Sequence, residues 1–331
     1  MSTLVAIALF LGVLLYAVFG GADFGAGFWD LTAGGAERGR RPRGLIDRSI
    51  GPVWEANHVW LIYCLVVMWT AFSGAFAAIM STLYIPLGLA ALGIVIRGSG
   101  FAFRKVSMRT PEQRVNGAAF ATASVVTPFF FGTVAGGIAS GRVPSAGAGD
   151  ALTSWVNPTS ILGGSLAVFV CAYLAAVFLI AEARARRAID LERWFRRRAL
   201  VAAVVTGGLS VGGIFILRVD AHRLFERLLG PGLPFVLAAV ASGGAALLLL
   251  QRASPQLLRA LAFGAVAAVV IGWGVAQFPY LLGTHLSIAA AAAPRPTLVS
   301  ILVVFALAGV LVVPSLILLF FLQQRGALEQ T

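Results

Sequence analysis

Residues 49–62 read SIGPVWEANHVWLI, and they open an apolar run that extends over residues 50–72. Pro52 suits the first turn of a helix, where its missing N–H costs no hydrogen bond. The run is close to the roughly 20 residues that an α-helix needs to cross a bilayer. Because backbone polar groups cannot stay unpaired in hydrocarbon, we predict a transmembrane helix here, and its first turns carry polar and aromatic side chains.

Eight further apolar stretches of similar length lie along the chain. In addition to 50–72, the predicted spans are 4–27, 76–97, 117–138, 159–181, 199–218, 233–250, 258–280 and 298–322. The alternation of apolar and polar residues that marks a membrane β-barrel is absent from the sequence. The sequence therefore predicts an all-α integral membrane protein. About nine transmembrane helices would form bundles within one polytopic domain over residues 1–331.

The composition excludes an ordinary soluble protein. Hydrophobic residues make up 59% of the 331 residues and charged residues only 11%, whereas a soluble domain is about 25% charged. In a soluble chain the formal net charge of +12 would suggest a nucleic-acid partner. Here the arginines cluster in short segments between apolar runs, which indicates contact with the lipid membrane and no nucleic-acid partner.

The arginine clusters also predict the orientation of the chain. If the N-terminus lies outside and the spans alternate, 20 of the 25 Lys and Arg residues fall in inner segments. Such an excess of basic residues is typical of the cytoplasmic side. We therefore expect the N-terminus outside and the C-terminus in the cytoplasm. The basic segment 182–198 is interpreted as an anchor at the inner headgroups.

Asp23 is one of two acidic residues that sit within apolar runs, where charged groups are costly and tend to be functional. It lies in the glycine-rich segment 16–27, YAVFGGADFGAG. Gly21 and Gly25 form a small-xxx-small pair that allows another helix to approach closely. Two interpretations have equal weight: a carboxyl group in a proton relay, or a helix-end aspartate that is hydrogen-bonded to the backbone.

Glu55 is the second acidic residue within an apolar run. It lies three positions before His58, so the two side chains share one helical face. Trp54, Asn57 and Trp60 add polar hydrogens nearby. The pattern favours a proton-handling or cofactor-edge cluster. The alternative is an interfacial belt of Trp and His, but Glu is not a belt residue.

Arg97 ends the predicted third span. It could pair with Glu55 or with a haem propionate of a neighbouring subunit, and the alternative is that its side chain snorkels to the inner surface. With Trp54, Asn57 and Trp60, Arg97 completes our candidates for a subunit interface or a haem edge.

A metal or haem site built by this chain alone is not expected. Glu55 and His58 form one Glu-x-x-His motif, whereas di-iron bundles need a second one and further carboxylates. The chain has three histidines, of which only His58 lies in a predicted span, so no histidine pair can ligate a haem between helices. The other two histidines, His222 and His285, lie in predicted outer loops.

Four of these segments resemble subunit II of cytochrome bd-type quinol oxidases. They are residues 16–27, 50–62, 97–101 and 277–279, and the run from Trp54 to Ile62 is the most specific. The first third of the chain carries most of the likeness. The short length is similar to that of the cyanide-insensitive branch of the family.

The resemblance implies a multi-pass subunit of the bacterial plasma (inner) membrane. It would form a heterodimer with the haem-bearing subunit I, in a respiratory terminal oxidase that oxidises quinol from the quinol pool and reduces dioxygen to water. Haems b and d and the quinol site would belong to subunit I. This chain would ligate no cofactor and would hold no complete active site. Some members hold a structural quinone, and a small accessory subunit can join the complex.

The resemblance also implies roles for single residues. Asp23 and Glu55 match the acidic positions of the family in the first and second helices. Gly20 and Ala102 stand where some relatives have further acidic residues. We therefore expect subunit II to brace subunit I and to help deliver protons, with Glu55 and His58 as the carriers.

Two other functions are compatible with the same residues. A proton-coupled transporter would use Asp23 and Glu55 as its coupling carboxylates, but it should show repeated halves and helices interrupted at matching positions. Neither feature is visible in the sequence. A purely structural membrane anchor would use Glu55 and His58 only for hydrogen bonds to a neighbour. A haem spectrum that appears only with a partner chain would distinguish the oxidase from both.

Overall fold

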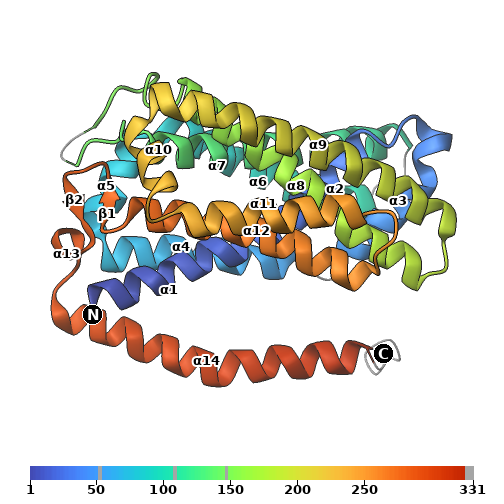
Figure 1. The fold of residues 1–331 in the computed structure, drawn as a ribbon. Coiled ribbons are helices and arrows are strands. Elements are labelled where there is room, and N and C mark those ends of the chain that lie inside the picture. Colours follow the sequence, from blue (N-terminus) through green and yellow to red (C-terminus); the bar gives the residue numbers. More distant parts are fainter. Residues whose placement is uncertain (51–53, 107–109, 146–147, 325–331) are drawn as a thin grey trace.

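The computed structural model describes residues 1–50, 54–106, 110–145 and 148–324. Long helices lie side by side along one common direction and form an elongated bundle (Figure 1). α14 lies at the periphery, where it packs against α1 and α4. The described chain is therefore mostly helical, as predicted.

The described part of the first half of the chain is helical apart from short connections. Its elements are α1 (Ser2–Leu15), the π-helical turn η1 (Tyr16–Gly20), α2 (Gly21–Leu31), α3 (Ala36–Ile50), α4 (Trp54–Ala71), α5 (Ser73–Thr82), α6 (Tyr84–Val106) and α7 (Thr110–Ala139). α1, η1 and α2 follow one another without a break and together form one candidate span, Ser2–Leu31.

The second half contains the most deeply buried helix, α8. Its elements are α8 (Pro158–Ala185), α9 (Ile189–Asp220), α10 (His222–Leu229), α11 (Leu233–Leu249), α12 (Pro255–Gln277), β1 (Tyr280–Leu282), β2 (Leu286–Ser287), α13 (Ile288–Ala291) and α14 (Arg295–Gln324). The two short strands pair antiparallel. They form a small hairpin at one end of the bundle (Figure 1).

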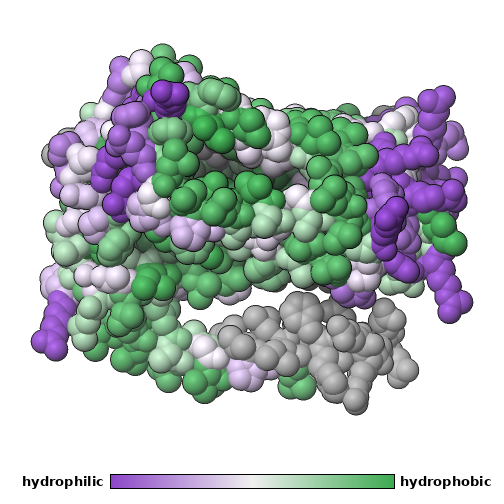
Figure 2. Space-filling model, viewed as in Figure 1, coloured by the Kyte–Doolittle hydropathy of each residue, from purple (hydrophilic) through white to green (hydrophobic). Residues whose placement is uncertain are grey.

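The surface has the polarity of a membrane protein. Figure 2 shows a broad apolar band between two polar ends. By length and composition, the described helices include six candidate membrane spans, or up to eight if each of two bent pairs counts as one. α14 adds a shorter apolar stretch, Arg295–Leu311. The predicted helical membrane architecture is confirmed, whereas the count of nine spans and the sides of the termini stay predictions.

The helix boundaries differ from the prediction most clearly at 76–97. This stretch is divided between α5 and α6, and α6 continues to Val106. The chain breaks at Phe72, and α4 and α5 meet at an angle of 118°. The side chain of Phe72 is completely buried at this corner. This corner coincides with the predicted gap between the spans 50–72 and 76–97, whereas the apolar pattern did not indicate the second break, at Leu83 between α5 and α6.

Small residues let α8 pass through the centre of the main core. Ala172, Ala175 and Ala176 are fully buried on α8, within a cluster that also takes side chains from α2, α7, α9 and α12. Gly25 on α2 faces the backbone of Cys171 so closely that a methyl group there would overlap the carbonyl oxygen. Contact between backbones is the usual way in which helices pack tightly in membranes.

The basic segments of the sequence converge on one end of the bundle. Three segments lie together at that end: α3, the turn between α8 and α9, and the turn between α11 and α12 (Figure 1). Arg196 donates hydrogen bonds to the carbonyl oxygens of Leu250 and, at 3.3 Å, Ala253. Arg259 donates to the carbonyl oxygen of Phe178 at 3.0 Å. These arginines therefore bind the ends of neighbouring helices together.

The opposite end is organised around Asp220, the last residue of α9. Its carboxylate binds Arg142 through two contacts, at 2.5 and 3.1 Å. It also accepts hydrogen bonds from the hydroxyl group and the backbone N–H of Thr159, at 2.6 and 3.1 Å. Because Thr159 lies in the first turn of α8, the negative charge sits at the positive end of that helix.

Candidate functional site

A buried ion pair joins α2 to α6. Arg97 Nη2 lies 2.7 Å from Asp23 Oδ1, and each side chain is only 1% exposed. Arg97 also donates to the backbone carbonyl oxygen of Asp23 at 3.3 Å. Two opposite charges at this depth stabilise each other in a medium of low polarity, and the loss of either leaves the other uncompensated.

The guanidinium group of Arg97 is held from several sides. Its Nε donates to Ser124 Oγ on α7 at 2.9 Å, and this hydroxyl group donates in turn to the carbonyl oxygen of Phe120 at 2.7 Å. The rings of Phe24 and Phe120 lie 4.8 and 5.0 Å from the guanidinium carbon. Cation–π contacts of this kind are favourable in desolvated sites. The arginine is therefore fixed by α2 and α7 at once.

Glycines explain how three helices can approach this arginine. A side chain at Gly27 would overlap Ser124, the residue that orients Arg97. On α6, a methyl group at Gly100 would lie 2.8 Å from the carbonyl oxygen of Asn116 on α7. The glycine-rich segment that surrounds Asp23 in the sequence thus serves close helix packing, as the small-xxx-small pattern predicts.

Tyr16 and His58 extend this ion pair into a larger polar group, which we call the Asp23 cluster: Tyr16, Asp23, His58, Arg97 and Ser124. Tyr16 and His58 are both close enough to Asp23 and Arg97 to interact with their charges. The Tyr16 hydroxyl and Asp23 Oδ2 are buried and have no hydrogen-bond partner within the described part of the chain. The cluster therefore retains the capacity for further hydrogen bonds.

The π-helical turn η1 places Tyr16 beside Asp23. Tyr16 begins this turn, and its ring packs edge-on against Phe24 and Phe131, with centroid distances of 6.4 and 6.0 Å. Gly20 ends the turn, and a methyl group there would lie 2.9 Å from the Tyr16 ring. Single π-helical turns are rare and often occur at functional sites.

The remaining predicted site residues lie on α4. Trp54 and Glu55 belong to its first turn, but their side chains lie outside the described part of the structure. Asn57 is buried, with 7% of its surface exposed. Trp60 is partly buried and packs edge-on against Tyr63 at 6.4 Å. Of the predicted site residues on α4 whose side chains are described, His58 is the one that interacts electrostatically with Asp23 and Arg97.

The structure contradicts one of the alternatives predicted for Arg97 and one of those predicted for Asp23. Arg97 does not snorkel to the surface, because its side chain is buried and ion-paired within the chain. Asp23 is not a helix-end aspartate, because it lies within α2 and binds a guanidinium group. The pairing joins residues 74 positions apart. Sequence reasoning also missed Tyr16 and Ser124, since an isolated hydroxyl group in an apolar run carries no distinguishing signal.

The histidines show no haem-binding or metal-binding arrangement. His222 and His285 line one polar cavity at the α10 end, and His58 lies on α4. Among the residues that the structure describes, no three His, Cys, Asp or Glu side chains gather in a way that could hold a metal ion. The donors present therefore do not fit a haem ligated by two histidines of this chain.

The chain matches one family model over most of its length. Residues 1–323 match the family model described as cytochrome bd terminal oxidase subunit II. The match includes every residue of the Asp23 cluster and the whole of α4.

Two curated relatives are similar over part of their length. Cytochrome bd ubiquinol oxidase subunit 2 of Bacillus subtilis is 29% identical over 161 residues, which cover 48% of this chain and 47% of the relative. Cytochrome bd-I ubiquinol oxidase subunit 2 of Escherichia coli is 28% identical over 209 residues, which cover 60% and 52%. The chain thus spans about half the length of the curated relatives that it matches.

A solved structure shares the fold over almost the whole chain. A chain of the bd oxidase from Geobacillus thermodenitrificans superposes with a TM-score of 0.74 and is 23% identical in sequence. The superposition covers 97% of this chain and 98% of that one. At this identity the likeness establishes the arrangement of the helices.

Proposed function

Because this chain belongs to the cytochrome bd terminal oxidase subunit II family, we propose that it is the haem-free subunit of a respiratory quinol oxidase. It would pair with a haem-bearing subunit I in the bacterial plasma membrane. The assembled complex would oxidise quinol and reduce dioxygen to water. Haems b and d, in the partner, would supply the electron-transfer and oxygen chemistry. The family match supports this function over a proton-coupled transporter.

The observation that carries the proposal is the Asp23 cluster within a chain of this family. An ion pair, a phenol and an imidazole lie inside an apolar bundle, where polar groups are expensive. Such groups persist in a membrane interior when they bind a partner, orient a helix or move protons. A subunit that braces a redox partner and delivers protons to it needs all three abilities.

We assign different roles to Asp23 and to Glu55, the two acidic residues within apolar runs. Asp23 is bound to Arg97, so we assign it to the positioning of α2 against α6. Glu55 and His58, one helical turn apart on α4, are the proposed proton carriers. Trp54, Asn57 and Trp60 stay the proposed contacts with subunit I or with a haem edge. A structural quinone and a small accessory subunit remain part of the proposed assembly.

Co-expression with a candidate subunit I tests the assignment directly. We expect the two chains to purify together in mild detergent, with a visible haem spectrum that is absent when this chain is purified alone. The purified pair should consume oxygen when supplied with a quinol. If this chain elutes separately while subunit I keeps its haems and its activity without it, the proposed function is wrong.

Replacing Glu55 by Gln should lower quinol-driven oxygen reduction about tenfold or more in an assembled complex. The amide keeps the shape of the side chain but cannot carry a proton, and positioned proton transfer commonly contributes about 10²-fold or more. Oxygen uptake and haem content should be measured on the same preparation. Unchanged uptake at full haem content would rule out Glu55 as a carrier.

A matched control removes a carboxylate far from the cluster. Glu226 lies on α10 with its side chain 65% exposed, where it pairs with His222. An exposed pair of this kind contributes little to stability. Glu226→Gln should therefore leave oxygen uptake unchanged, which separates the loss of a carrier from the loss of one negative charge.

A further inference from the structure

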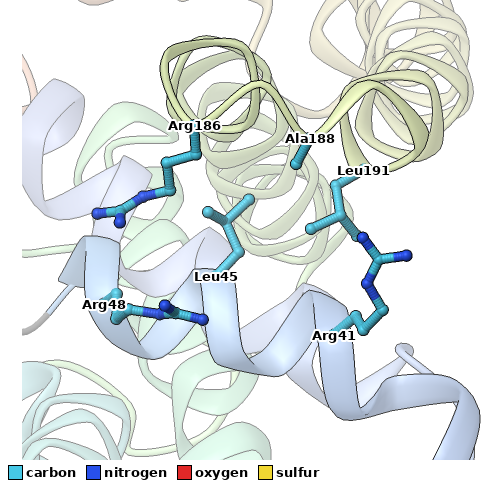
Figure 3. Close-up of a pocket in the computed structure, with 6 residues that line it drawn as sticks. All are labelled: Arg41, Leu45, Arg48, Arg186, Ala188 and Leu191. Atoms are coloured by element: carbon cyan, nitrogen blue, oxygen red, sulfur yellow. The ribbon is translucent and has the colours of Figure 1, made fainter.

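A cavity at the basic end of the bundle has the composition of a binding site. It lies between α3 and the turn that joins α8 to α9, and its volume is about 260 Å³. The lining residues are Arg41, Leu45, Arg48, Arg186, Ala188 and Leu191 (Figure 3). We call it the α3 pocket. It is separate from the Asp23 cluster and shares no residue with it.

The α3 pocket combines an apolar floor with a cationic rim. Leu45 and Leu191 are buried, with 3% and 8% of their surfaces exposed, and Ala188 lies beside them. Three arginine side chains, those of Arg41, Arg48 and Arg186, are exposed. In Figure 3, Arg48 and Arg186 lie on one side of Leu45 and Arg41 on the other. A ligand in this pocket would therefore meet positive charge around an apolar base.

The charge of this rim is only partly balanced within the chain. Arg41 forms an ion pair with Asp190 at 2.5 Å. Arg48 donates from Nε to the carbonyl oxygen of Gly44 at 2.9 Å, which leaves its two terminal nitrogens as donors. Among the described residues, no carboxylate pairs with Arg48 or Arg186. Two guanidinium groups are thus available to an anion.

The backbone around the α3 pocket is fixed before any ligand binds. α8 ends in a turn where Arg187 adopts a left-handed conformation, with φ of 56°. The N–H of Ala188 then donates to the carbonyl oxygen of Ala183 at 2.9 Å, as in a Schellman motif. On the other wall, Arg43 binds Asp30 at 2.8 Å and ties α3 to the end of α2. Both walls are therefore held in place.

Guanidinium groups recognise phosphate oxygens through paired hydrogen bonds. A free phosphate ion would gain nothing from Leu45 and Leu191, whereas an amphiphile would cover them. α3, which forms one wall of the pocket, lies at one end of the bundle (Figure 1), and this end is polar beside the apolar band (Figure 2). We propose that the α3 pocket binds the phosphodiester group of an anionic phospholipid, with Arg48 and Arg186 on the phosphate and the glycerol and acyl carbons over the leucines.

Lipid binding to the full chain in mild detergent tests the proposal. The probe is phosphatidylglycerol, titrated into delipidated protein and counted as bound lipid per chain by native mass spectrometry. The double variant Arg48→Gln/Arg186→Gln should raise the dissociation constant about tenfold or more, since it removes both guanidinium groups that would bind the phosphate. Arg48→Lys/Arg186→Lys, which keeps the charge without the paired geometry, should show a smaller loss.

The control variant Arg193→Gln/Arg197→Gln removes the same charge from exposed positions of α9 outside the pocket. It should change the dissociation constant about twofold or less. If both glutamine variants weaken lipid binding equally, the effect is due to net charge and the proposal is overturned. The proposal is also overturned if neither variant weakens lipid binding. Displacement of the lipid by a large excess of inorganic phosphate would assign the pocket to free phosphate and also overturn it.

Discussion

Arg97→Gln is expected to destabilise the chain by about 3–5 kcal/mol, the largest effect of any side-chain change considered. The substitution leaves the Asp23 carboxylate buried without its cation, and a single buried charge costs far more than a buried pair. It also removes the donor to Ser124 and the contact with the rings of Phe24 and Phe120. The expected observation is a large fall in the yield of monodisperse protein and in the unfolding temperature.

A double variant separates the ion pair from simple loss of packing. Arg97→Met combined with Asp23→Leu removes both charges, so it should be more stable than Arg97→Gln alone. Arg193→Gln, at an exposed position of α9, should unfold like the parent protein. An Arg97→Gln variant that unfolds at the temperature of the parent protein would contradict a stabilising role of the ion pair.

Gly25→Ala should destabilise the chain by about 3 kcal/mol, because the added methyl group has no space. It would overlap the carbonyl oxygen of Cys171, which belongs to the backbone of the central helix α8 and cannot rotate away. α2 would have to move outwards, and overpacking of this kind commonly costs about 1–3 kcal/mol. The movement would also strain the contact between Asp23 and Arg97. Unfolding temperature and yield measure the effect.

Gly208→Ala provides the matched control for this prediction. Gly208 also lies inside a long helix, α9, but nothing stands within 4 Å of a methyl group built on it. Alanine there should be neutral or stabilising by about 0.5–1 kcal/mol, since glycine is a poor helix former. Equal losses in Gly25→Ala and Gly208→Ala would show that close contact between α2 and α8 is unimportant.

The architecture was largely predictable because membrane hydropathy acts over whole helices. Most of the predicted apolar stretches fall on one continuous helical segment in the described part of the chain, since lipid leaves the backbone no other way to pair its polar groups. The break at Leu83, between α5 and α6, was not predicted, because it lies inside the apolar stretch 76–97. The predicted span 258–280 also runs three residues past the end of α12 at Gln277.

The candidate site was predictable in its parts but not in its pairing. Asp23 stands out in the sequence because a carboxylate in an apolar run is costly. For its partner, Arg97, the sequence left open a pair with Glu55, a haem propionate or a side chain that reaches the inner surface, and Asp23 was not among the predicted partners. The choice between these outcomes depends on how α2 and α6 both pack against α7, which glycines at 27 and 100 allow. Such contacts join distant segments, and a local pattern does not encode them.

The π-helical turn at Tyr16–Gly20 has a consequence for comparing sequences. Such a turn holds one residue more than an α-helical turn, so it rotates everything after it by roughly 100°. Asp23 faces Arg97 with that extra residue in place. A homologue whose first helix is regular would carry the equivalent acid one position earlier. Aligning the two correctly therefore requires a single-residue gap between positions 16 and 20.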